Sequence, residues 1–279
     1  MSWRRKSNGF ISTIWRYLLN IRADCLYTLR IREKGSMKML TYEFPLNEKS
    51  RTYLRFDALF QQLKANQTFE LPTHAFSFFR ALFDFIELSE RCDIRTDLMK
   101  DLEKQRQKLE SWSQLPEVDL QKLSTLQAEL ASLIYELPRS VRAGSRFKED
   151  KFLCAIRQRF SIPGGLCPFD VPILHHWLGL PLAARLADVQ AWLGELDLLI
   201  RATERLLQLW RDSGSFVEQV AKNGFYQANA ENAELIRLLV DQGQGHYPTM
   251  SGHKSRFALR FLPLGDLETG DIRFQLASC

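Results

Sequence analysis

Two arginines near the C-terminus have the spacing of an anion-binding pair. Side chains alternate through residues 256–262, which places Arg256, Ala258 and Arg260 on one side of the chain. A period of two is typical of a strand with one face on a core. The expected core residues are Phe257, Leu259 and Phe261. Because guanidinium groups bind planar anions in bidentate fashion, the outward face suits the carboxylates or backbone carbonyls of a partner. The alternative interpretation is a solvated strand face.

Other residues that carry chemistry do not assemble into a catalytic or metal site. Cys167 lies eight residues before His175, but no nucleophile motif surrounds it, and a buried structural cysteine is the commoner case. His175 and His176 are adjacent, so on a helix they diverge by about 100° and do not share a metal easily. Gly164-Gly165 lacks the Lys-Ser/Thr of a phosphate loop and indicates a turn. We therefore predict no enzyme, no cofactor and no metal.

Composition and charge narrow the possible functions. The chain has 279 residues, of which 45% are hydrophobic and 25% charged, as in an ordinary globular protein. No apolar run approaches the roughly 20 residues of a membrane span. Scattered cysteines without a Cys-x-x-Cys pair indicate reduced thiols in the cytoplasm.

Positive charge is concentrated at the start of the chain. Residues 1–36 hold eight Lys/Arg against two Asp/Glu, which leaves 30 Lys/Arg and 31 Asp/Glu in residues 37–279. This nearly neutral body argues against a general nucleic-acid binder.

The first 36 residues differ in kind from the rest. They are rich in arginine, poor in acidic residues, and carry apolar residues at helical spacing from Phe10 to Leu19. Three interpretations stay open: a helix on an anionic membrane surface, a targeting peptide, or translated sequence upstream of the true start. Met37 and Met39 are alternative initiators, and we favour the third interpretation.

Alternating segments at both ends of the chain predict strands. Residues 40–44 and 272–276 alternate as residues 256–262 do, so we expect the two ends to meet in one antiparallel sheet. The fold class is therefore expected to be α+β, with a mainly helical domain plus a smaller antiparallel β domain built from both ends of the chain. The expected boundaries are a basic extension 1–38, a helical domain 47–222, and a β domain of 39–46 with 223–279.

Helical spacing dominates the middle of the chain. A helix is expected in residues 47–66, with an apolar ridge of Tyr53, Phe56, Phe60 and Leu63. A second, mostly buried helix is expected after Thr73, which we interpret as its N-cap. Its charged stripe consists of Arg80, Asp84, Glu87 and Arg91. For Arg91 the alternative to a binding role is an ion pair with Glu87 one turn away.

Further helices follow with different surfaces. Narrow apolar seams in residues 95–112 and 120–137, on either side of Pro116, predict an antiparallel helical hairpin that packs on the domain body or makes a dimer contact. A basic amphipathic helix over 148–159 and a short helix that begins near Pro172 come next. Two more helices are expected before the C-terminal strands.

Five motifs point to a known family. They are PLNEKSRTYLR (45–55), RQRFSIPGG (157–165), FDVPILH (169–175), NGFYQ (223–227) and SGHKSRFALRF (251–261). In order and spacing they resemble the ZapD family, the Z-ring-associated proteins of bacterial cell division. The resemblance runs from about Met39 to Cys279, and residues 1–38 fall outside it.

The resemblance implies a function as well as a fold. It implies a non-enzymatic cytoplasmic homodimer that acts at mid-cell, with a helical domain and a smaller β domain. Members of the family bind the C-terminal tail of FtsZ, the tubulin-like division GTPase, and cross-link its filaments into bundles. A locally basic but globally neutral body suits such a short acidic and apolar peptide better than it suits a polyanion.

The resemblance also assigns the tail contacts to basic residues, namely Arg55, Arg91, Lys151, His175, Lys254, Arg256 and Arg260. Lys151 stands where an arginine is expected, so it keeps the charge but lacks the bidentate fork. We expect these side chains to gather in one anion-accepting pocket. The alternative function is a nucleic-acid-binding module that uses the basic N-terminal extension and the basic strand face, and an enzyme ranks third.

Overall fold

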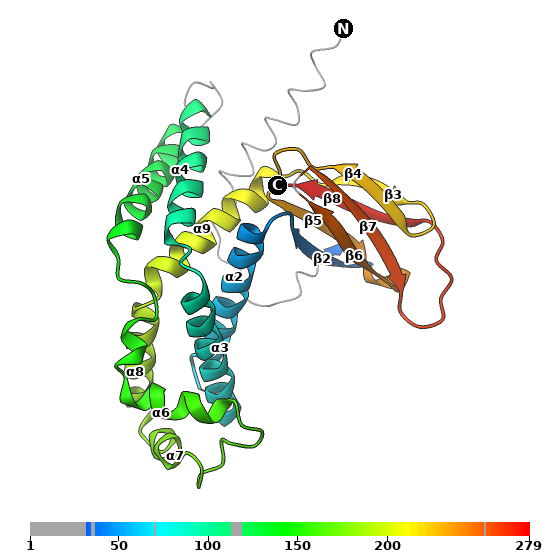
Figure 1. The fold of residues 1–279 in the computed structure, drawn as a ribbon. Coiled ribbons are helices and arrows are strands. Elements are labelled where there is room, and N and C mark those ends of the chain that lie inside the picture. Colours follow the sequence, from blue (N-terminus) through cyan, green and yellow to red (C-terminus); the bar gives the residue numbers. More distant parts are fainter. Residues whose placement is uncertain (1–31, 35–36, 70, 113–118, 254) are drawn as a thin grey trace. The chain divides into compact units, whose positions relative to one another are not determined.

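The described part of the chain runs from strands through helices to strands again. The computed structural model describes residues 32–34, 37–69, 71–112, 119–253 and 255–279 (Figure 1). The helices are α2 (Glu48–Asn66), α3 (Pro72–Arg91), α4 (Arg95–Trp112), α5 (Leu120–Glu136), α6 (Lys151–Phe160), α7 (Pro172–Leu178), α8 (Leu182–Gly194) and α9 (Asp197–Ser213). The strands are β1 (Arg32–Lys34), β2 (Met37–Pro45), β3 (Val217–Ala221), β4 (Phe225–Asn229), β5 (Leu235–Asp241), β6 (His246–His253), β7 (Arg256–Pro263) and β8 (Ile272–Ser278). The α+β prediction is confirmed.

The described residues divide into two compact units. The first holds the described residues up to Leu54, residues 112 and 119–123, and Leu207–Cys279. The second holds Arg55–Ser111 and Ser124–Leu206. The described strands therefore belong to the first unit, together with the first turns of α2 and the last turns of α9. In the described part of the chain, no helix is both long and apolar enough to cross a membrane.

Apolar spacing accounts for α2 and α3. The predicted ridge of α2 is fully buried, and the predicted charged stripe of α3 is exposed along its length, so both predictions are confirmed.

The predicted N-cap of α3 is wrong. Helix α3 begins at Pro72 after the N-cap Leu71, so Thr73 lies inside its first turn. Proline suits the first helical position because its fixed φ is already helical and its missing N–H would have no partner there.

Aromatic side chains dominate the core of the second unit. Phe79 of α3 lies 5.4 Å from Trp177 of α7 and 5.6 Å from Trp192 of α8, measured between ring centroids. Phe152 of α6 stacks on Trp192 at 5.8 Å. The Trp192 indole N–H donates to Asp150, whose other carboxylate oxygen accepts from a backbone N–H as the N-cap of α6. These contacts fix the short helices against α3.

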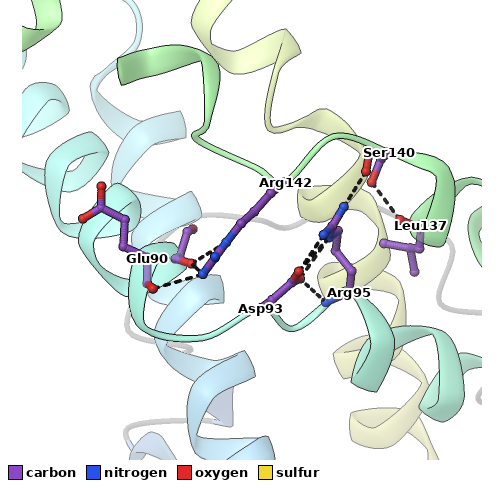
Figure 2. A network of polar contacts seen from close by, with 7 residues as sticks. Glu90, Asp93, Arg95, Leu137, Ser140 and Arg142 are labelled. Atoms are coloured by element: carbon purple, nitrogen blue, oxygen red, sulfur yellow. Dashed lines mark hydrogen bonds and ion pairs between the residues drawn. The ribbon is translucent and has the colours of Figure 1, made fainter. Parts of the chain in front are cut away.

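A guanidinium caps the end of α3 (Figure 2). Arg142 donates through Nε to the Ser89 carbonyl at 3.1 Å and through Nη2 to the Glu90 carbonyl at 3.0 Å. The last carbonyls of a helix have no partner within the helix and carry partial negative charge. A cation at this position therefore satisfies hydrogen bonds and stabilises the helix terminus.

A second guanidinium ties α4 to the chain after α5. Arg95 forms an ion pair with Asp93 at 2.6 Å and donates to the carbonyl of Ser140 (Figure 2). The hydrogen bond from Arg95 holds the pKa of Asp93 below its usual range. The start of α4 thus lies next to the chain that follows α5, as the predicted antiparallel hairpin requires.

Two antiparallel sheets make up most of the first unit. The strand order is β1-β2-β5-β8-β3 in the larger sheet and β4-β7-β6 in the smaller one. Strands β2 and β8 share the larger sheet through β5, as in the pairs Glu43 with Arg237 and Leu238 with Leu276. The expectation that the two ends of the chain meet in one antiparallel sheet is therefore confirmed for β2 and β8, whereas β7 lies in the other sheet. Alternation alone does not identify a strand's sheet, because a strand of either sheet can bury one face.

The expected boundaries differ from the observed elements at two places. Helix α9 ends at Ser213, and residues 217–221 pair with β8 although we placed them in the helical domain. Strand β1, which pairs with the start of β2, lies inside the extension 1–38. The helix expected from Phe10 to Leu19, and with it the interpretation of the N-terminal segment, lies outside the described residues.

The two sheets share one apolar core. Phe274 of β8 lies 5.2 Å from Tyr226 of β4 and 5.0 Å from Phe261 of β7, again between ring centroids. Phe257, Leu259 and Phe261 are all buried in this core, as predicted from their alternation. The apolar face of β7 is therefore held between the sheets, and its other face points away from the core.

A buried ion cluster lies within the first unit. Glu43 of β2 accepts from Arg237 of β5 at 2.9 Å and from Arg211 of α9 at 2.8 Å. Arg237 is only 8% exposed, and it also donates to the carbonyl of Arg211. A buried charge is tolerated when paired and hydrogen-bonded, so these three side chains form a satisfied structural cluster.

Candidate functional site

The outward face of β7 presents two cations. Arg256 and Arg260 are both exposed, and Ala258 between them is half-buried. At about 3.3 Å per residue, their Cα atoms are roughly 13 Å apart along the strand. The alternation predicted for residues 256–262 is confirmed, and a rigid element carries both guanidiniums.

The surroundings of the two arginines differ. Gln227 of β4 reaches Arg256, and its amide oxygen accepts from that guanidinium in the orientation that satisfies both groups. Arg260 lies opposite Phe225 on β4 and Thr249 on β6. Among the residues that the structure describes, no side chain pairs with the Arg260 guanidinium.

Arg55 and Arg91 share an open pocket of about 370 Å³ in the second unit. Its lining comes from two helices, with Arg55, Ala58 and Leu59 from α2 and Asp84, Glu87, Leu88 and Arg91 from α3. Arg91 forms the expected ion pair with Glu87, and its side chain stays largely exposed. Two arginines and two carboxylates leave the pocket without net charge, but its apolar floor is open to a partner.

The Asp84 carboxyl in this pocket has a pKa above its ordinary value. Burial raises its pKa, Arg80 lowers it, and Glu87 raises it. Burial in this pocket thus partly withdraws the Asp84 carboxyl from water.

Lys151 and His175 lie on consecutive helices of the second unit. Lys151 is the first residue of α6, His175 lies in α7, and both side chains are exposed. No hydrogen bond joins these two side chains in the part of the chain that the structure describes. His176 is exposed as well, so neither imidazole is a buried core histidine.

The expected site residues thus divide between the units. Arg55 and Arg91 share a pocket in the second unit, whereas Arg256 and Arg260 share a strand face in the first. Lys254 lies outside the described residues. Each group presents exposed cations, which is the property that an acidic peptide requires.

The residues that carry chemistry in the sequence stay apart in the described part of the chain. No hydrogen bond connects Cys167 with His175, and no group of three or more His, Cys, Asp and Glu among these residues is placed to hold a metal ion. Burial raises the pKa of the Cys279 thiol to about 11, so this cysteine is a poor nucleophile at neutral pH.

Sequence reasoning missed two neighbours of the arginines, Phe225 and Gln227. They alternate with Tyr226 and Ala228, and this alternation predicts a strand over Phe225–Asn229. The sequence does not show which strand pairs with it. Only the register of β4 on β7 shows that Phe225 is opposite Arg260.

Comparisons with known proteins agree on one family. A family model described as ZapD, cell division protein, matches residues 54–260. A cell division protein ZapD of Pectobacterium carotovorum subsp. carotovorum (strain PC1) is 45% identical over 244 residues, which cover 86% of this chain and 97% of the relative. A protein of the same name from Vibrio atlanticus (strain LGP32) is 43% identical over 86% of this chain and 100% of the relative. Another from Klebsiella pneumoniae (strain 342) is 45% identical over 85% of this chain and 98% of the relative. The chain therefore belongs to the ZapD family of cell division proteins.

Proposed function

We propose that this chain binds the C-terminal tail of FtsZ and cross-links FtsZ filaments into bundles, which promotes Z-ring assembly. The observation that carries the proposal is the pair of exposed guanidiniums, Arg256 and Arg260, on a strand whose other face is buried in the sheet core. A rigid strand presents such groups without the cost of ordering its backbone on binding. Membership of a family of cell division proteins supports the same function.

The proposed tail contacts are Arg55, Arg91, Lys151, His175, Lys254, Arg256 and Arg260. The arginines offer bidentate hydrogen bonds to carboxylates, whereas Lys151 offers a point charge. The pocket lined by Arg55 and Arg91 adds apolar contact through Ala58, Leu59 and Leu88. This combination favours a short peptide that is both acidic and apolar.

Cross-linking requires more than one tail site per particle. We propose a homodimer, because a two-fold assembly repeats each site and can hold two filaments. Along a polymer with many tails, the effective concentration of tails converts weak single-site binding into firm bundling. The proposed role is non-enzymatic and needs no cofactor, and the proposed location is the cytoplasm at mid-cell.

Co-sedimentation tests this function. FtsZ polymerised with GTP is centrifuged at low speed, alone and with the full chain, and FtsZ without its C-terminal tail is the control. We expect the chain to pellet with bundles of full-length FtsZ only. Equal pelleting with both forms would exclude the tail as the docking site, and no pelleting with either form would reject the cross-linking function.

A further inference from the structure

The outer face of the smaller sheet carries two large apolar side chains near the arginines. Phe225 of β4 is 47% exposed and Tyr247 of β6 is 39% exposed. The adjacent Tyr226 contacts Phe274 in the core, so Phe225 points to the opposite side of the strand. Single exposed apolar residues are common, but two beside an exposed cation have the composition of a binding surface.

Strand pairing determines which of these side chains are neighbours. Phe225, Arg260 and Thr249 are directly opposite one another in a row across β4, β7 and β6. Tyr247 is opposite Leu262 in the next row of this face, diagonal to Arg260. Side chains directly opposite have Cβ atoms about 5 Å apart, and diagonal pairs are about 7–8 Å apart. Both aromatic rings are therefore within reach of the Arg260 guanidinium.

Small side chains occupy the middle of this face. Ala258 of β7 is opposite Ser251 of β6, and Thr249 occupies the row of Arg260. These small side chains leave the two rings and the Arg260 guanidinium as the prominent exposed groups at this end of the face. A cation between two apolar groups favours an occupant with a negative charge between two apolar side chains. A uniformly charged polymer would leave the rings unused.

We propose that Phe225, Arg260 and Tyr247 form an aromatic platform, which docks a peptide that carries a carboxylate between large apolar side chains. The carboxylate binds Arg260, and the apolar side chains pack on Phe225 and on Tyr247. This inference rests on the proposed tail binding, and it names the chemistry that the tail presents to this face. Tyrosine and arginine are enriched among the residues that dominate binding energy at interfaces.

Affinity measurements with two labelled peptides test the platform. The probes are a peptide of the FtsZ C-terminal tail and a synthetic peptide with one Asp between two Leu residues, both followed by fluorescence anisotropy. We expect Phe225→Ser and Tyr247→Ser each to weaken binding about tenfold. These variants should leave the salt dependence of Kd unchanged, whereas Arg260→Gln should reduce it because the ionic contact is lost.

Two control variants separate docking from folding. Val217→Ser changes a residue that is 56% exposed on β3 of the larger sheet, and it should leave both affinities unchanged. Phe225→Leu keeps an apolar side chain and should retain most of the affinity. Thermal melts of all variants report whether the fold is intact.

Each outcome is informative. Unchanged binding of the tail by both Ser variants would overturn the aromatic platform and leave the proposed function standing. Phe225-dependent binding of the synthetic peptide without binding of the tail would support the platform and reject the tail as partner. Binding of neither probe would reject both proposals. If a Ser variant unfolds, the peptide is changed instead of the protein. The wild-type protein is titrated with a synthetic peptide whose two Leu residues are replaced by Ser, and a Kd equal to that of the original synthetic peptide would overturn the platform.

Discussion

Arg256 and Arg260 share a strand face but not the same neighbours. Gln227 lies beside the Arg256 guanidinium, whereas Arg260 lies between Phe225 and Thr249. The Arg256 guanidinium thus has a neutral amide beside it, and the Arg260 guanidinium is available for a direct ion pair. The two residues thus contribute to the same positive potential in different ways.

Charge reversal at these two residues is the sharpest test at this scale. The double variant Arg256→Glu with Arg260→Glu should weaken tail binding by about a hundredfold or more, because attraction becomes repulsion. Both side chains are exposed, so the thermal melt and the sedimentation coefficient should stay close to those of the wild type. Anisotropy, melting curves and sedimentation velocity measure the three quantities.

A matched control for the reversal is Arg273→Glu. Arg273 is an exposed arginine of β8 in the larger sheet, and its reversal should leave tail binding nearly unchanged. Normal binding by the double variant would show that the β7 face is not the docking surface. An unfolded double variant would instead show that these arginines are structural.

At the scale of elements, the end of α3 depends on one side chain from a distant segment. Arg142 supplies the hydrogen bonds to the carbonyls of Ser89 and Glu90. The sequence after α5 therefore stabilises a helix that ends about 50 residues earlier in the chain.

Removing this cap should destabilise the protein. We expect Arg142→Ala to lower the free energy of unfolding by about 1–2 kcal/mol, because carbonyls at the helix end lose charged donors. Denaturant unfolding, followed by circular dichroism, measures the change. Arg159→Ala removes an exposed arginine from α6 and should change stability by less than about 0.5 kcal/mol. Equal losses in both variants would show that the cap contributes nothing specific.

At the scale of the whole molecule, positive charge is local and not general. Residues 37–279 carry 30 basic and 31 acidic side chains, so no large net field attracts a partner from far away. Binding to an acidic tail then depends on the exposed cations near the contact, and such exposed ion pairs are screened by salt.

Filament bundling should therefore weaken as salt rises. Between about 0.05 and 0.5 M salt we expect the amount of chain that pellets with FtsZ to fall by several-fold, since the Debye length shrinks from about 14 to 4 Å. FtsZ polymer pelleted alone at each salt concentration controls for effects on polymerisation. A flat response would show that apolar contacts, and not ionic ones, dominate docking.

Local patterns predicted several elements correctly. Alternation in residues 256–262 predicted both the buried and the exposed face of β7, and the apolar ridge of α2 predicted its buried side. Strand β5 was missed, because all but its last residue are buried and no alternation marks it. The start of α3 was misplaced, because Pro72 takes the first helical position ahead of Thr73.

The sequence by itself determined the α+β class, the family, the exposed arginines of β7 and the near-neutral charge of residues 37–279. These properties follow from composition and from the polarity of successive side chains, since each face of a helix or strand is buried or solvated according to its own residues. Only the tertiary structure decided that β7 belongs to a second sheet, that Gln227 lies beside Arg256 and that Phe225 lies opposite Arg260. Strand pairing joins segments far apart in the chain, and a slip of one residue would exchange the two faces of a strand, so register depends on the packing of the whole unit.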